Sequence, residues 1–490
     1  MKTQSSPILR TLLLLLLATV TLGVSASKVK TPGGKRYIFR YTLKDKAGTL
    51  GMLSEPHRYL SQRSLKRRER QGLRVDSTDL PVSHAYIRQF MTDSTTVLGT
   101  SRWHNTVVVA SEDSAVLARL STLPMVREAR CVYIAPDSID KPADIRWTVH
   151  EEFNTWDTVH NDPYGMGRPQ MEMLNGIRLH DRGLKGRGMT IAVLDGGFRN
   201  YDRIPALQWT DIAGVRDFVA LPLSRDELRK TGRRRDELVR EARRQALHAI
   251  DHGTKVLSVM AAYAPEVLLG AAPDATYWLL RCEDPTTEQP VEEDYWTMAA
   301  EFADSVGADI VSSSLGYYAY DGDRGSYRLQ DLDGRTAFIS QTASLLARKG
   351  MVLCNSAGNA GMGQWKKIGV PADATDILTV GAVDKTGRVA AFSSVGPSQD
   401  LRVKPDVVAT GAPTTLLSGR GTLVQDMGTS FSTPLISGLT ACLWQGCPQL
   451  TALEIIELVR RSASDSEEPT NITGYGIPDF WRAYTDAVAP

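Results

Sequence analysis

The sequence lacks the features that identify several common classes of protein. It has only five cysteines in 490 residues, and no Cys-x-x-Cys pair or His/Cys cluster of the kind that binds zinc. The net charge of +1 gives no indication of nucleic acid or an anionic membrane as the main partner. No apolar run beyond the N-terminal segment approaches the length of a membrane-spanning helix. We therefore expect neither nucleic-acid binding nor an integral membrane segment in the mature chain.

The N-terminal segment itself is typical of an export signal. Lys2 and Arg10 precede a short leucine-rich run, and the small residues 24–26 follow where a signal peptidase would cut. Residues 1–26 are therefore predicted to be a signal peptide, and the mature protein is expected to be secreted or periplasmic.

The rest of the chain is too long for one hydrophobic core, so two or more folded units are expected. Residues 27–136 read as a small α+β unit with strands at "YIFRYTL", "NTVVVAS" and "REARCVYI". Its dibasic cluster, Lys66 to Arg68, is interpreted as the solvated face of a helix, with a processing site as the alternative. Residues 137–167 lose periodicity and are predicted to be a linker.

Residues 168–490 alternate apolar strands with helical segments. This pattern predicts an α/β domain with a mostly parallel sheet and helices on both faces. One densely charged, arginine-rich stretch over 224–245 interrupts it and is interpreted as a surface helical insertion. Cys282, Cys354, Cys442 and Cys447 permit three pairings that the sequence does not decide, and buried free thiols are equally compatible with the runs around Cys354 and Cys442.

Three polar residues lie at predicted element ends in this domain. Asp195 follows the strand "IAVL", His252 begins an apolar helix, and Ser430 precedes another. Each has an ordinary explanation as a cap or a buried polar group. Together they provide a carboxylate, a base and a hydroxyl, which is the set that activates a serine nucleophile. Asn359, in "NSAGNAG", lies between glycines and supplies a side-chain amide that could bind an oxyanion, although a plain turn would explain it equally well.

Five sequence blocks resemble those of the subtilisin-like serine proteases, the subtilases. They are Asp195-Gly196-Gly197, His252-Gly253-Thr254, Ser314-Leu315-Gly316, Ala357-Gly358-Asn359 and Gly428 to Pro434, in the family's order. The stretches "EEDYWTMAAEFADSVGADIVSSSLGY" and "GYGIPDF" are closest to secreted subtilases of Bacteroidetes-type bacteria. The resemblance implies a subtilisin-like three-layer fold for 168–490.

The resemblance also implies roles for these residues. Asp195 would orient the base, His252 would act as general base and acid, and Ser430 would attack the carbonyl. Asn359 and the Ser430 backbone N–H would bind the oxyanion. In substrate binding, Ser314, Leu315 and Gly316 would pair with an extended protein or peptide substrate beside Gly358. Lys255 stands where many members have a second, non-catalytic histidine.

The α+β unit resembles the family's propeptide, a ferredoxin-like domain that acts as an intramolecular inhibitor; a permanent extra domain is the alternative. No cofactor is certain, and the structural calcium that subtilases often carry is possible but unassigned. The acidic stretch "RCEDPTTEQPVEED" is interpreted as a solvated loop, with a preference for basic substrate residues upstream of the cut as the alternative.

The sequence thus predicts an exported serine endopeptidase made as a self-processing zymogen. The alternative is a catalytically retired scaffold that acts as a binding or structural protein, but such scaffolds typically lose a triad member or the oxyanion donor. A lipase-type hydrolase requires a GxSxG elbow and the order Ser, Asp, His, and this chain has the reverse order. Activity is expected to rise as His252 deprotonates, near the usual imidazole pKa of about 6.5.

Overall fold

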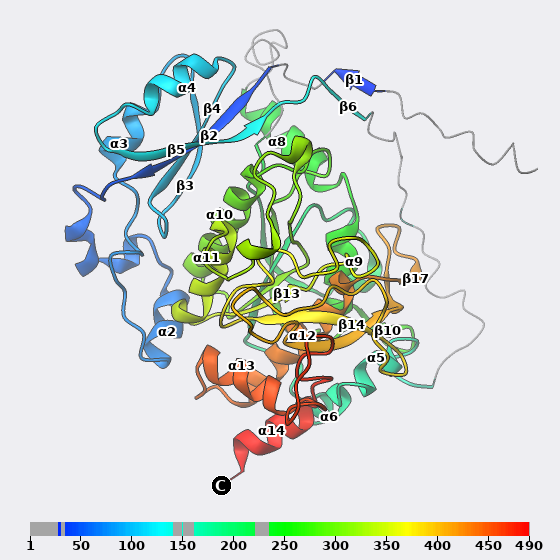
Figure 1. The fold of residues 1–490 in the computed structure, drawn as a ribbon. Helices are drawn as coiled ribbons and strands as arrows, with labels where there is room; N and C mark the ends of the chain where they lie inside the picture. The colour runs from blue at the N-terminus through cyan, green and yellow to red at the C-terminus, as the bar shows by residue number, and fades with distance from the viewer. Residues whose placement is uncertain (1–27, 31–34, 141–148, 150–160, 221–234, 490) are drawn as a thin grey trace, which may run out of the picture.

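The computed structural model describes residues 28–30, 35–140, 149, 161–220 and 235–489. An N-terminal unit, blue to cyan in Figure 1, lies against one side of a larger body coloured from green to red. The predicted signal peptide, most of the linker before residue 161 and the first part of the arginine-rich stretch lie outside the described residues.

A seven-stranded sheet forms the centre of the larger body. Its strand order is β15-β14-β13-β12-β7-β11-β8, and every neighbouring pair is parallel. The strands are β7 (Thr190–Asp195), β8 (Asp211–Asp217), β11 (Thr276–Arg281), β12 (Ile310–Ser313), β13 (Val352–Ser356), β14 (Leu378–Asp384) and β15 (Val407–Ala412). This confirms the predicted α/β class.

The strands of the sheet are buried on both sides, because helices cover both of its faces. In β7, Ile191 and Val193 belong to one hydrophobic cluster, whereas Ala192 and Leu194 belong to another. The first cluster lies under α9 (His252–Ala261) and α12 (Thr429–Gly446), and the second under α10 (Val291–Val306) and α11 (Phe338–Leu346). Helices α13 (Ala452–Arg461) and α14 (Phe480–Val488) pack beside α12.

The carboxyl ends of four neighbouring strands define the working edge of this sheet. Arg281 is in register with Asp195, and Ser313 is in register with Leu194. The segments that follow β11, β7, β12 and β13 therefore emerge side by side, at the position where open parallel sheets place their functional residues.

The N-terminal unit has the expected α+β architecture. Its antiparallel sheet has the order β3-β4-β2-β5, with strands β2 (Tyr37–Leu43), β3 (Thr96–Ser101), β4 (Thr106–Ser111) and β5 (Val126–Ile134). Helices α2 (Gln62–Arg70) and α3 (His84–Gln89) come between β2 and β3, and α4 (Ser114–Leu120) precedes β5. This order is that of a ferredoxin-like split β-α-β unit.

The other α-helices and strands of the described chain are β1 (Lys28–Lys30), β6 (Ser138–Asp140), α5 (Arg168–Glu172), α6 (Gly176–Asp181), α8 (Arg235–Leu247), β9 (Tyr263–Ala264), β10 (Leu268–Leu269), β16 (Thr414–Leu417) and β17 (Leu423–Asp426). Its short 3-10 helices are η1 (Leu50–Ser54), η2 (Pro56–Arg58), η4 (Pro205–Leu207), η5 (Asp321–Asp323), η6 (Leu329–Asp331) and η7 (Ala347–Lys349). Helix α8 is the described part of the predicted arginine-rich insertion. All five cysteine thiols are free, and those at 282, 354, 442 and 447 are buried. Among the helices described, none combines the length and apolarity needed to cross a bilayer.

The interface between the two units is unusually rich in buried charge. Asp304, on α10, is fully buried and accepts hydrogen bonds from Arg67 at 2.5 Å, from Arg68 at 2.8 Å and from Arg102 at 2.5 Å. Burial opposes ionisation of Asp304, but the three guanidinium groups outweigh it and lower the carboxyl pKa.

The prediction that Lys66 to Arg68 form a solvated helix face is therefore wrong for two of its residues. Arg67 and Arg68 are 3% and 1% exposed, and Arg68 also pairs with Asp79 at 3.0 Å. Their charge is retained in the interior because carboxylates on both units compensate it, which no local sequence pattern reveals.

We expect Asp304→Ala, made in the Ser430→Ala background of the full chain, to destabilise the folded precursor by about 3–5 kcal/mol, because it leaves the buried guanidinium of Arg67 without its paired carboxylate. Urea unfolding followed by tryptophan fluorescence measures this. Asp486→Ala, which breaks an exposed pair with Arg482 on α14, is the control and should change stability by less than about 0.5 kcal/mol. Equal effects of the two variants would contradict a structural role for the Asp304 cluster.

Candidate active site

Asp195 and His252 form a direct ion-pair contact at the working edge. Asp195 is the last residue of β7 and is fully buried. His252, the first residue of α9, places Nδ1 2.8 Å from Asp195 Oδ2 and 3.0 Å from Oδ1. The Gly196 backbone N–H also donates to Asp195 Oδ1 at 2.8 Å. The second ring nitrogen of His252, Nε2, takes no part in this contact and is available for proton transfer. The His252 side chain is 33% exposed.

The surroundings raise the pKa of His252 to about 9. Burial lowers this pKa, but the Asp195 charge, its hydrogen bond and the charge of Glu283 raise it further than burial lowers it. The expected value of about 6.5 is therefore wrong: the position at a helix N-terminus disfavours the imidazolium, but the neighbouring carboxylates have the larger effect.

Ser430 does not cap its helix. Gly428 is the N-cap residue of α12, and Ser430 lies within the first turn, 8% exposed. Its hydroxyl donates to the Ser314 carbonyl over a long 3.5 Å. The next residue, Phe431, packs its ring 5.6 Å from that of His252, so the hydroxyl and the imidazole lie in the same part of the molecule.

Pro434 explains how the first turn of α12 is joined to the sheet. In a regular helix the N–H of residue 434 would donate to the carbonyl of Ser430, but proline has no N–H. That carbonyl instead accepts a 2.8 Å hydrogen bond from Ser314 Oγ, just beyond β12. The proline thus frees one acceptor, and Ser314 uses it to fix the turn that carries Ser430.

Asn359 lies on the exposed loop after β13, and its amide is oriented by Thr429. The Thr429 backbone N–H and hydroxyl both donate to Asn359 Oδ1 at 3.0 Å. With the oxygen held in this way, the amide nitrogen is left as a donor beside the first turn of α12. Gly358 precedes it at φ 103°, a conformation that favours glycine, and donates its N–H to Thr429 Oγ1 at 3.2 Å.

The predicted substrate-binding segment follows β12 directly. Ser314 and Leu315 are buried, whereas Gly316 is exposed. The Leu315 carbonyl already accepts from Asn355 Nδ2 at 3.2 Å. Beyond the segment, Tyr317 exchanges two 2.8 Å backbone hydrogen bonds with Val370, which fixes its path.

Thr429 and Lys255 make contacts at the site that the sequence did not indicate. Thr429 orients Asn359, and Lys255 pairs with Asp426 at 2.9 Å. The acidic stretch is not a solvated loop: Glu292 and Glu293 are fully buried, and Asp294 pairs with Arg40 of the N-terminal unit at 2.6 Å. The only signal for this in the sequence was the apolar pattern of α10.

No group of three or more histidine, cysteine, aspartate or glutamate side chains in the described ranges is arranged to hold a metal ion. Because backbone carbonyl oxygens and water also bind calcium, the structural calcium that the resemblance suggests stays an unassigned prediction.

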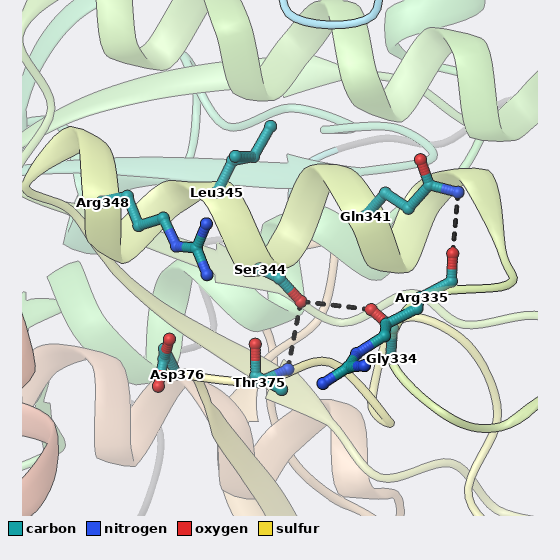
Figure 2. A pocket seen from close by; sticks show the side chains of 8 residues that line it. All are labelled: Gly334, Arg335, Gln341, Ser344, Leu345, Arg348, Thr375 and Asp376. Carbon is teal, nitrogen blue, oxygen red and sulfur yellow. Dashed lines mark hydrogen bonds between the residues drawn. The ribbon is translucent and has the colours of Figure 1, made fainter.

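A separate hollow of about 480 Å³ lies beside α11 (Figure 2). Its walls are tied together, because Ser344 Oγ bonds to the Gly334 carbonyl and the Thr375 N–H, and Gln341 bonds to the Arg335 carbonyl. None of its lining residues belongs to the predicted site.

Comparison with known proteins identifies the family of the chain. The model of the subtilase family, peptidase S8, matches residues 186–476, and that of the peptidase S8 propeptide domain of Bacteroidota matches residues 39–146. The chain is similar to an alkaline protease of Alkalihalobacillus alcalophilus, with 24% identity over 76% of this chain and 83% of that protein. Subtilisin Savinase of Lederbergia lenta is 25% identical over 64% of this chain and 96% of its own length.

Among solved structures, the prenylagaramide maturation protease PagA is similar with a TM-score of 0.47 and 19% identity, covering 64% of this chain and 98% of that one. The family match spans more than half of the sequence and includes every residue of the site described above. The chain therefore belongs to the subtilase family of serine proteases and carries an S8 propeptide domain in its N-terminal part.

Proposed function

We propose that this serine protease is an exported endopeptidase in which Asp195, His252 and Ser430 form the catalytic triad. The observation that carries the proposal is the contact of Asp195 with His252 Nδ1 at 2.8 Å, which fixes the ring so that its other nitrogen can take the serine proton. Residues 1–26 provide the export signal.

The mechanism follows from the order of donors and acceptors. Ser430 Oγ attacks the scissile carbonyl while neutral His252 accepts its proton, and Asp195 stabilises the imidazolium that forms. The Asn359 amide and the Ser430 backbone N–H donate to the oxyanion of the tetrahedral intermediate. His252 then returns the proton to the leaving amine, and a water molecule hydrolyses the acyl-enzyme by the same steps in reverse.

The N-terminal unit is proposed to act as an inhibitor that the enzyme itself removes. Its sheet and α2 pack on α10, and the backbone of Ile134 is held on both sides by Gln289 at 2.9 and 3.1 Å. The chain thus leaves β5 close to the turn that follows β11, beside the working edge. We place the maturation site within 137–167, after this contact.

Ser430→Ala is expected to abolish self-processing, because only the serine hydroxyl can form the acyl-enzyme. Intact mass over time, measured on the chain without its signal peptide, should show loss of an N-terminal fragment of propeptide size from wild type only. Casein hydrolysis by the variant should fall by at least about a thousandfold.

Ser432→Ala is the matched control for this experiment, since its hydroxyl bonds only to the Thr429 carbonyl within the same helix; it should process like wild type. Equal cleavage of wild type and Ser430→Ala would show that a foreign protease makes the cut.

We expect kcat/KM to rise with pH, with the midpoint of the rise near pH 9. Only neutral imidazole accepts the serine proton, so a raised pKa moves the rising limb to higher pH. Lys255 lowers this pKa, and Lys255→Met should therefore move the midpoint upward. Rates measured from pH 6 to 10.5 check both points. A midpoint that stays near 6.5, or a downward shift in Lys255→Met, would contradict the electrostatic account.

Asn359→Ala is expected to lower kcat by about 10²–10³-fold with little change in KM, because the amide donates to charge that exists only in the transition state. Steady-state kinetics on a peptide substrate measure this. Asn471→Ala, in an exposed loop, is the control and should leave both constants unchanged. An effect confined to KM would assign Asn359 to ground-state binding instead.

A further inference from the structure

Three carboxylates beside the working edge have no direct ionic partner among the described residues. Glu283 follows β11, and its Oε2 lies 2.8 Å from the position that a Cβ atom would occupy on Gly196, the residue after Asp195. Glu288 and Glu292 lie in the next turn and at the start of α10. These three, with the Tyr317 hydroxyl, are referred to below as the acidic cluster.

Two buried polar atoms of the acidic cluster have no hydrogen-bond partner. Glu292 is fully buried; its Oε1 accepts from the Asp284 N–H at 2.8 Å, but its Oε2 accepts from nothing in the described chain. Tyr317 is 1% exposed, and its hydroxyl is also unpartnered there. An unsatisfied buried polar group costs free energy, so these two atoms indicate a missing partner.

Electrostatics place these groups together. The charges of Glu292 and Glu283 both raise the pKa of Tyr317, after burial as the main cause. Burial, Asp195 and Glu288 raise the pKa of Glu283 to about 8, whereas His252 and Arg281 lower it, so the carboxyl group holds its proton near neutral pH. A cation beside it would favour the ionised form.

The neighbouring acidic residues differ because the fold already satisfies them. Glu293 accepts from Tyr320 and Tyr327 at 2.9 and 2.8 Å, and Asp294 is paired with Arg40. Arg281, which lowers the pKa of Glu283, is already bonded to the Gly196 carbonyl and Asp217, both at 3.0 Å. Glu283 is the member of the acidic cluster whose charge acts on His252.

We propose that the acidic cluster receives a lysine or arginine side chain of the substrate, close to the scissile bond on its acyl side. Tyr317 directly follows the proposed substrate segment 314–316, so a peptide along that segment passes the acidic cluster. A substrate ammonium or guanidinium brings several N–H donors and a positive charge. The donors match the two unpartnered oxygens, Glu292 Oε2 and the Tyr317 hydroxyl, and the charge favours ionised carboxylates in the acidic cluster. The carboxylates are not arranged to hold a metal ion in the described structure, which favours a cationic side chain over a bare ion. This inference rests on the proposed triad.

The test is a series of fluorogenic peptides that carry either lysine or norleucine at each of four positions before the cut. The processed enzyme should prefer lysine at one of these positions by at least about tenfold in kcat/KM. The double variant Glu283→Gln/Glu288→Gln should reduce that lysine-to-norleucine ratio to about one. Glutamine keeps the shape and removes carboxylate repulsion, so the variant is expected to fold.

Two further variants separate the acidic cluster from general negative charge. Asp284→Asn removes one carboxylate charge next to Glu283, at a side chain that already accepts a hydrogen bond from Thr286. This variant should keep the preference for lysine over norleucine. Tyr317→Phe changes no charge and should lower the ratio about threefold.

Cleavage of norleucine and lysine peptides at equal rates would overturn this inference while leaving the proposed triad intact. No cleavage of any peptide or of casein would overturn the triad itself. Equal losses of preference in Asp284→Asn and in the double variant, or a preference that appears only when Ca²⁺ is added, would also overturn the proposed role of the acidic cluster.

Discussion

The buried carboxylate of Asp195 is the constraint around which the site is arranged. Its charge is balanced by the His252 ring and the Gly196 N–H, and not by a guanidinium, although Arg281 is its register partner on β11. Arg281 turns to Asp217 and the Gly196 carbonyl instead. If it paired with Asp195, the imidazole would lose most of the field that stabilises its charged form. Because Arg281 points elsewhere, the charge of Asp195 acts on His252 and is the main cause that raises its pKa.

The proposed nucleophile, Ser430, is positioned by a different means. In a regular α-helix beginning at Thr429, the carbonyl of Ser430 would accept from the N–H of residue 434 and would not be available to the segment after β12. Pro434 removes one internal donor, and Ser314 supplies the replacement from β12. Since the same β12 continues into the proposed substrate segment, helix start and substrate position are coupled through one hydrogen bond. Thr429 extends this coupling to Asn359.

Much of this could be predicted from the sequence, because it depends on local patterns. Alternating apolar strands and helices gave the parallel sheet, and the residues at element ends, Asp195, His252 and Ser430, gave the candidate triad. What could not be predicted depends on contacts between distant segments. Arg67 and Arg68 looked like solvent-facing helix residues because their partner, Asp304, lies more than 200 positions away. A shorter separation, 27 and 34 positions, still hides the reason why Glu293 is buried: its donors, Tyr320 and Tyr327, come from the loop after β12.

Glu283 and Tyr317 illustrate the limit most clearly. In the sequence, Glu283 is one of several acids in a polar stretch, and nothing distinguishes it from Asp284 or Glu293. The difference arises only because β11 and β12 flank β7, so that the residues after both strands converge over Asp195. A buried acid that the fold satisfies, such as Asp294, has a structural role. Glu292 keeps one buried oxygen, Oε2, without a donor among the described residues. The proposal gives that oxygen a partner from the substrate, because in a protease of this family the substrate is the molecule that reaches this edge.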